Sequence, residues 1–335
     1  DLRMTRMFEE YQRRTKDFAV GAIKEKFPFF LFRNERDYHA AGGPPKSAGV
    51  YIESRDGSKR LMAIAGQHTD DNTWSVVQHE GFHQFVAATI KYDLPVWVNE
   101  GLAEYFGEAQ WTGDGFVTGL IPQQRLEAIR KGIRRGFMPF AQLMAMTDRE
   151  WSADLTNENY DEAWSMVHFL ANADSGKYQG PFLKFMTEVS KGIDGQKAWV
   201  DVFGKDTAAF QQRYAAWWMS LPDEPTMGGF LKVMVQTETS YLARAMIMRQ
   251  SFPDAETFFK KYQPPALGVN RDLWLPPELF GMYREVAPRV GDWKIENGAA
   301  PRLILKMDDG TTFVGTFSAS NGKVTRVDVA VGMTK

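Results

Sequence analysis

The hydrophobic pattern of the first third of the chain changes its period several times. Residues 3–26 place apolar side chains at intervals of three and four among charged ones, which predicts an amphipathic helix. The apolar run FPFFLFRN at 27–34 predicts a buried strand, and AGVYIES at 48–54 and RLMAIAG at 60–66 predict two further strands. RDGS lies between the last two and has the composition of a turn.

A helical period then dominates as far as residue 222. The polar run 71–73 supplies N-cap candidates for a helix over about 74–91. Pro95 interrupts the pattern, and a second helix is expected from about Val98 through NEGLAEYFGEA. Residues 123–222 contain several further amphipathic segments, which are typical of a helical lobe.

The pattern changes again after residue 222. PDEPTMGG at 222–229 is typical of a linker, and helical segments follow it. The final part alternates apolar and polar residues in RLILKM, TTFVGTF and VTRVDVAV, separated by DDG and SNG, which predicts an antiparallel β-meander. We therefore predict an α+β protein with a first domain at 1–222 and a helical plus β-meander module of unknown role at 225–335.

Composition limits the partners and the metal ligands. The 335 residues carry a formal net charge of −2 and no long run of Lys or Arg, so nothing predicts a nucleic-acid or membrane-surface partner. No apolar run approaches the roughly 20 residues that cross a bilayer. The absence of cysteine excludes disulfides and thiolate ligands, so that any metal must be held by His and carboxylates.

The segment VVQHEGFHQF at 76–85 is the first candidate for chemistry. Because residues four apart lie on one face of a helix, His79 and His83 can direct two imidazoles at one ion. Glu80 follows His79, where a base is needed to take a proton from a metal-activated water. An accidental HExxH has odds of about 1% in a chain of this length, and histidines on an apolar helix face are more often structural, so the motif alone establishes no site.

A second segment, LPVWVNEGLAEYF at 94–106, supplies what two histidines lack. A catalytic zinc site takes three protein ligands and leaves one position for water. A short connection could carry Glu100 back over the first helix as the third ligand, and Glu104, one turn further on, could accept a ligand imidazole N–H. Asn99 could cap the second helix or bind substrate backbone. The alternative is a solvated face, but this helix is apolar on much of its surface and buried carboxylates need partners, which favours the three-ligand interpretation.

HEGFH followed by WVNEGLAEYF resembles the gluzincin zinc metallopeptidases, in particular the peptidase-MA-like bacterial proteins, many of them exported and known only as domains of unknown function. The resemblance extends over roughly 1–220. It implies a thermolysin-like domain with a small mixed sheet, the HExxH helix, a helical lobe and a cleft that holds Zn²⁺. His79, His83 and Glu100 would then bind the zinc, with Glu80 as general base.

The resemblance also implies how substrate is held. The strand at 48–54, with Gly49, Val50 and Tyr51, would pair its edge with an extended peptide. Related gluzincins stabilise the oxyanion with a tyrosine downstream of the third ligand, at the start of a helix. Tyr160 in NENYDEAWSMVHFL fits that place, with His168 as its rival and a core-packing tyrosine as the alternative.

These observations predict a zinc peptidase acting on a peptide or protein substrate. The edge segment lacks the Gly-x-Met-Glu-Asn pattern by which related aminopeptidases hold a free N-terminus, which favours an endopeptidase, although Glu53 could take that role. One alternative is a zinc-stabilised binding or scaffold module with lost or very restricted activity; another is an all-helical interaction module in which HEGFH is incidental.

Composition and resemblance together indicate a location for the protein. The absence of cysteine and the family resemblance favour an exported protein, periplasmic or extracellular. A sequence that starts at Asp1 without Met is consistent with a signal peptide that has been removed, and a cytoplasmic location also fits the composition. The side-chain preference and the oligomeric state are not predicted.

Overall fold

The computed structural model describes residues 2–19, 21, 23, 28–45, 47–54, 59–65, 70–153, 157–266, 268 and 270–333. The chain forms two compact units. The larger unit comprises Phe8–Ala109 and Ile121–Pro225, and the C-terminal unit comprises Asp1–Met7, Gln110–Leu120 and Thr226–Lys335. The turn predicted for RDGS lies outside the described residues.

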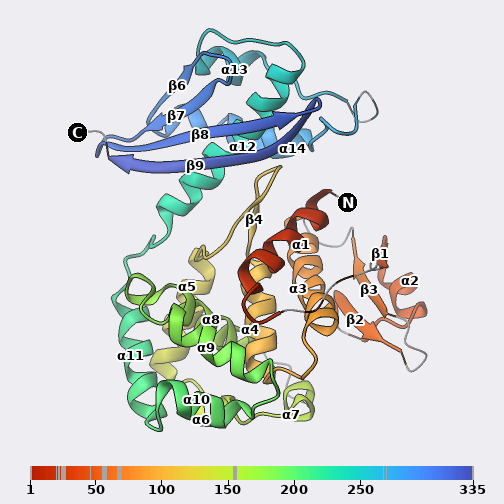
Figure 1. The fold of residues 1–335 in the computed structure, drawn as a ribbon, viewed down its shortest axis with the longest axis vertical. Coiled ribbons are helices and arrows are strands. Elements are labelled where there is room, and N and C mark those ends of the chain that lie inside the picture. The colour runs from red at the N-terminus through yellow and green to blue at the C-terminus, as the bar shows by residue number, and fades with distance from the viewer. Residues whose placement is uncertain are drawn as a thin grey trace. The chain divides into compact units, whose positions relative to one another are not determined.

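The larger unit combines one small sheet with a lobe of helices (Figure 1). Its elements are, in chain order, α1 (Leu2–Thr15, whose first residues belong to the C-terminal unit), β1 (Phe29–Phe32), α2 (Glu35–Ala40), β2 (Gly49–Glu53), β3 (Lys59–Ile64), α3 (Asp70–Thr89), α4 (Val96–Gly107), α5 (Gln123–Arg135), α6 (Phe140–Leu143), α7 (Asp148–Ala153), α8 (Asn157–Gly176), α9 (Gln179–Val189), α10 (Gly195–Phe203) and α11 (Thr207–Ser220). The chain is thus mixed α+β, which excludes the all-helical alternative.

The sheet has the order β1–β3–β2, and all three predicted strands are present. β1 runs parallel to β3, whereas β2 pairs with β3 in antiparallel register. The prediction that FPFFLFRN is buried is wrong, since Phe30 and Leu31 are 44% and 47% exposed. These side chains are exposed because β1 lies at the edge of the sheet, where its only neighbour among the described strands is β3. β2 forms the opposite edge and is likewise paired on one side only.

Three helix boundaries differ from those predicted. α1 ends at Thr15 instead of continuing to residue 26, because the Thr15 carbonyl accepts the N–H groups of Phe18 and Ala19 and turns the chain so that Phe18 is buried. α3 begins at Asp70, so the polar run 71–73 lies inside the helix and does not cap it. Pro95 precedes α4, as predicted, but the helix begins at Val96, two residues before the expected start near Val98.

The C-terminal unit is a long helix with a four-stranded sheet. Its elements are β4 (Gln110–Trp111), β5 (Phe116–Val117), α12 (Met227–Ile247), α13 (Ala255–Lys261), α14 (Pro277–Arg284), a 3₁₀ turn (Ala287–Arg289), β6 (Asp292–Glu296), β7 (Arg302–Lys306), β8 (Thr311–Ser320) and β9 (Lys323–Met333). The sheet is an antiparallel meander of order β6–β7–β8–β9, and α12 packs on β7, β8 and β9 (Figure 1). The predicted meander is confirmed, with β6 as an additional strand.

The short β4–β5 hairpin packs with α12, although the predicted domain boundary placed residues 110–120 in the first domain. Ser240 of α12 donates a hydrogen bond to the Thr112 carbonyl at 2.9 Å, and Arg244 forms an ion pair with Asp114 at 2.6 Å. Both charged side chains are almost fully buried, so each requires the opposite charge of the other as its partner. Of the helices in the described ranges, none combines the length and hydropathy of a membrane span.

Candidate metal centre

His79, His83 and Glu100 converge on one point between α3 and α4. The two histidines lie one turn apart on α3, and their Nε2 atoms are 3.1 Å from each other. Glu100 Oε2, from α4, lies 3.4 Å from His79 Nε2 and 3.5 Å from His83 Nε2. Each residue thus offers one donor atom, and the three donors lie within 4.8 Å of one another. Two imidazole nitrogens and one carboxylate oxygen are a common donor set for catalytic zinc.

Buried contacts hold the two helices in this register. The Gln78 amide, next to His79, donates hydrogen bonds of 3.1 Å to the carbonyls of Phe106, Gly107 and Ala109 at the end of α4. The Phe106 carbonyl also accepts the Ala109 N–H at 3.1 Å, and the buried Gln78 side chain adds a donor that ties this end of α4 to α3. No pattern in the sequence singled out Gln78 for this role.

A glycine sets the distance between α4 and the helix behind it. A β-carbon at Gly101 would stand 2.5 Å from the Ala163 carbonyl oxygen of α8. α4 therefore lies against α8 at the residue that follows Glu100, and the ligand carboxylate is positioned from both sides.

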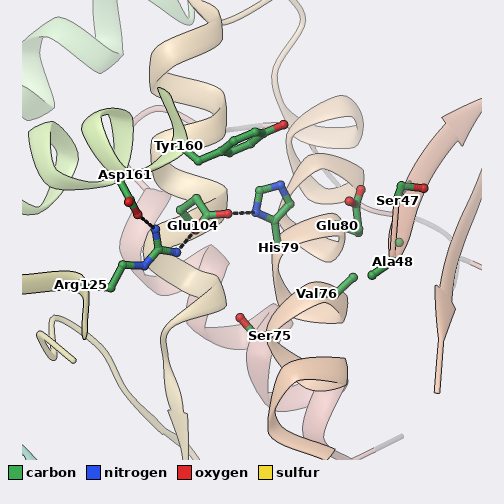
Figure 2. Close-up of a pocket in the computed structure, with 11 residues that line it drawn as sticks. Ser47, Ala48, Ser75, Val76, His79, Glu80, Glu104, Arg125, Tyr160 and Asp161 are labelled. Atoms are coloured by element: carbon green, nitrogen blue, oxygen red, sulfur yellow. Dashed lines mark hydrogen bonds and ion pairs between the residues drawn. The ribbon is translucent and has the colours of Figure 1, made fainter. Parts of the chain in front are cut away.

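Glu104 orients His79 as the sequence led us to expect. Its Oε1 lies 3.1 Å from His79 Nδ1 (Figure 2). A hydrogen bond there places the His79 proton on Nδ1 and leaves the Nε2 lone pair facing His83 and Glu100. Burial opposes ionisation of Glu104, but the hydrogen bond to His79 and the nearby Arg125 lower its pKa to about 2, so it remains an acceptor.

The donor group is also electrostatically suited to a cation. Burial disfavours the charged form of His79, but hydrogen bonds to Glu100 and Glu104 raise its pKa well above the ordinary value. Burial opposes ionisation of Glu100, but the charges of His83 and His79 and their hydrogen bonds lower the pKa of its carboxyl group. The site therefore attracts positive charge, and a divalent ion would compete with the proton on His79.

Two buried polar atoms near the converging donors have no hydrogen-bond partner among the described residues. Within the described part of the chain, His83 Nδ1 is buried and has no hydrogen-bond partner. The same holds for Asn99 Oδ1. Pro95, not Asn99, occupies the N-cap position of α4, which leaves substrate binding as the predicted role of Asn99.

Glu80 lies between the candidate metal ligands and β2. Its Oε2 accepts the Tyr51 backbone N–H at 2.8 Å, a contact that sequence reasoning missed. A β-carbon at Gly49 would stand 2.3 Å from Val76 Cγ1 and 3.2 Å from Glu80 Cγ, so only glycine lets β2 approach α3 this closely. The predicted edge strand thus borders the candidate centre.

Tyr160 lies in the first turn of α8 and faces His79, with ring centroids 6.3 Å apart (Figure 2). Burial and the charge of Glu100 raise the pKa of Tyr160 to about 12, so its hydroxyl keeps its proton at neutral pH. His168 is buried among aromatic rings, including Trp164 and Trp218, which fits the structural role favoured for it from the sequence.

Three residues that the sequence did not single out complete the site. Arg125 of α5 forms ion pairs with Glu104 and Asp161 (Figure 2). It forms a third ion pair with Glu108 at 2.8 Å. The spacing of Glu100, Glu104 and Glu108 places three carboxylates on one face of an otherwise apolar helix. That spacing was a signal for a cationic partner, although not for which cation.

These residues surround an open cleft of about 590 Å³. β2, α3, α4, α5 and α8 all contribute to its lining, which includes Gly49, His79, Glu80, Glu104, Arg125 and Tyr160. The candidate base, the oriented imidazole and the tyrosine therefore share one cavity within the larger unit.

A family model described as "Protein of unknown function (DUF1570)" matches residues 73–193. The matched segment contains the three converging donors, Glu80, Arg125 and Tyr160, but not β2. No curated protein matches the chain.

Proposed function

We propose that this protein is a zinc-dependent peptidase of the gluzincin type, which hydrolyses peptide bonds with Glu80 as general base. The observation that carries the proposal is the convergence of His79 Nε2, His83 Nε2 and Glu100 Oε2 within 4.8 Å. The position of Glu104 supports it, because a carboxylate behind a ligand histidine is a regular feature of zinc sites.

His79, His83 and Glu100 would hold the ion. Bound zinc would supply Lewis-acid chemistry by acidifying a water molecule and polarising the scissile carbonyl. The three-residue donor set leaves one coordination position for that purpose. With a bound ion, two neutral imidazoles and one carboxylate would offset its charge only in part, which would preserve its acidity.

The chain itself would move the proton. The Tyr51 N–H fixes Oε2 of Glu80, which leaves Oε1 to take a proton from water and deliver it to the leaving amine. The Tyr160 hydroxyl, whose pKa of about 12 keeps it protonated, would donate a hydrogen bond to the developing oxyanion.

The free edge of β2 suits an extended substrate. The Ala48 carbonyl accepts the Ile64 N–H on the β3 side, so the alternation of a strand turns the backbone groups of Gly49 and Tyr51 outward. Since Glu80 already accepts the Tyr51 N–H, an added peptide strand would pair with the backbone groups of Gly49 and with the Tyr51 carbonyl at the cleft. Glu53 is not among the described residues that line the cleft, which supports the endopeptidase prediction.

Glu80→Gln tests the proposal sharply. Glutamine keeps an oxygen that accepts the Tyr51 N–H but cannot act as a base, so the edge contact persists while catalysis is lost. We expect about one zinc per wild-type chain, cleavage of peptides with blocked N-termini, and at least about 100-fold lower kcat in the variant with zinc retained.

A scaffold role is the second candidate, since the Tyr51 contact gives Glu80 a structural use as well. Zinc binding by wild type and variant without cleavage by either, in a library of blocked and free peptides, would favour that role. Wild-type protein without zinc would refute both.

A further inference from the structure

We propose that Arg125 is the positioning residue of this cleft, fixing through Glu104 the orientation of the metal ligand His79 and through Asp161 the place of Tyr160. The inference rests on the proposed function. It concerns a side chain that contacts neither the three converging donors nor the candidate base, and that no local motif in the sequence marks.

Glu104 is held by two partners at once. Its Oε1 faces His79 Nδ1 at 3.1 Å, and its Oε2 is paired with Arg125 Nη2. A carboxylate with one partner can rotate about its final torsion, whereas a carboxylate with both oxygens engaged has a fixed plane. Arg125 therefore determines the direction in which Glu104 accepts the His79 proton, and so the direction of the Nε2 lone pair.

Arg125 is itself immobilised. Its Nε pairs with Glu108 Oε1 at 2.8 Å, one turn beyond Glu104 on α4, and its guanidinium carbon lies 5.3 Å from the centroid of the buried Trp164 ring. These contacts use separate nitrogens and one face of the planar group. The fork geometry of a guanidinium serves several carboxylates in fixed directions, which a lysine ammonium cannot do.

The remaining nitrogen reaches the other wall of the cleft. Arg125 Nη1 pairs with Asp161 Oδ1, and Asp161 directly follows Tyr160 in the first turn of α8 (Figure 2). One side chain of α5 thus connects the ligand helix α4 to the helix that carries Tyr160. The geometry points to a clamp that sets the spacing between the metal ligands and the tyrosine hydroxyl.

Zinc affinity tests the Glu104 half of the clamp without any need for catalysis. Competition with a chromophoric chelator would be measured for wild type, Arg125→Met, Glu104→Gln and the double variant. We expect each single change to weaken zinc binding about 10-fold and the double variant to be no weaker than Glu104→Gln, because Arg125 acts through Glu104.

Arg130→Met is the matched control. Arg130 lies on the same helix, has a similarly buried side chain and pairs with Asp223 away from the site, so zinc affinity should not change. If thermal unfolding shows that Arg125→Met does not fold, Arg125→Lys replaces it, and the same dependence on Glu104 is expected.

Measurements of kcat at saturating zinc test the second half of the clamp, in which Arg125 positions Tyr160 through Asp161. Arg125→Met should lower kcat about 10-fold in wild type but less than about 3-fold in a Tyr160→Phe background, since both changes disturb one interaction. Additive losses would overturn this half. Unchanged zinc binding in the Arg125 variant, or equal weakening with and without Glu104, would overturn the first half. Wild type that binds no zinc would overturn the proposed function as well.

Discussion

Gly101→Ala should damage the metal centre more than it damages the fold. Gly101 follows the ligand Glu100 on α4 and faces α8. The added β-carbon would stand 2.5 Å from the Ala163 oxygen and 2.8 Å from Val167 Cγ2, whereas ordinary contacts begin at 3.4 Å. Since the Ala163 carbonyl belongs to a helix backbone, α4 must move away from α8 by somewhat less than about 1 Å.

Two opposing effects determine the stability of this variant. Alanine is favoured over glycine inside a helix by about 1 kcal/mol. Overpacking of a well-filled interior costs about 1–3 kcal/mol. The balance is a loss of about 0–2 kcal/mol, so the protein should still fold. Metal sites tolerate far smaller displacements than this one, so zinc affinity should fall at least about 10-fold.

Urea unfolding of the metal-free protein and chelator competition would measure the two effects separately. Gly180→Ala is the control, because Gly180 lies on α9 in the same unit with no heavy atom within 4 Å of the new β-carbon. That variant should be neutral or more stable by up to about 1 kcal/mol and should bind zinc normally. Wild-type zinc affinity in Gly101→Ala would refute the claim that close packing of α4 on α8 positions Glu100.

Three further predictions concern single groups. Tyr160→Phe should lower kcat at least about 100-fold while leaving zinc affinity unchanged, as measured by steady-state kinetics and chelator competition; equal losses of both would contradict an oxyanion role. Zinc at 100 times its dissociation constant should stabilise the protein by about 2.7 kcal/mol, seen as a higher Tm that His79→Ala abolishes. Burial raises the pKa of Glu162 to about 8 from an ordinary value of 4.5, so the folded protein keeps a proton that the unfolded chain releases, and stability should fall as pH rises between these values. In urea unfolding, the free energy of unfolding of Glu162→Gln relative to that of wild type should therefore rise by about 3 kcal/mol from pH 4 to pH 7. Parallel curves of unfolding free energy against pH would disprove this account.

Local patterns predicted much of the secondary structure. The period of 3.6 residues located the helices around His79 and Glu100, short apolar segments located β2 and β3, and alternation located β7, β8 and β9. The hairpin β4–β5 and the strand β6 were missed. The two-residue strands of the hairpin provide too few positions for alternation to stand out from its surroundings.

The sequence by itself determined which residues could share a helix face, because the spacing of His79 and His83 becomes a distance as soon as the helix forms. It could not determine which distant segment would meet that face. Arg125 and Asp161 reach Glu104 only because α5 and α8 pack beside α4, and Tyr51 reaches Glu80 only because Gly49 admits β2 against α3. Such contacts arise from packing and charge pairing summed over the whole unit, and no short stretch of sequence contains that information.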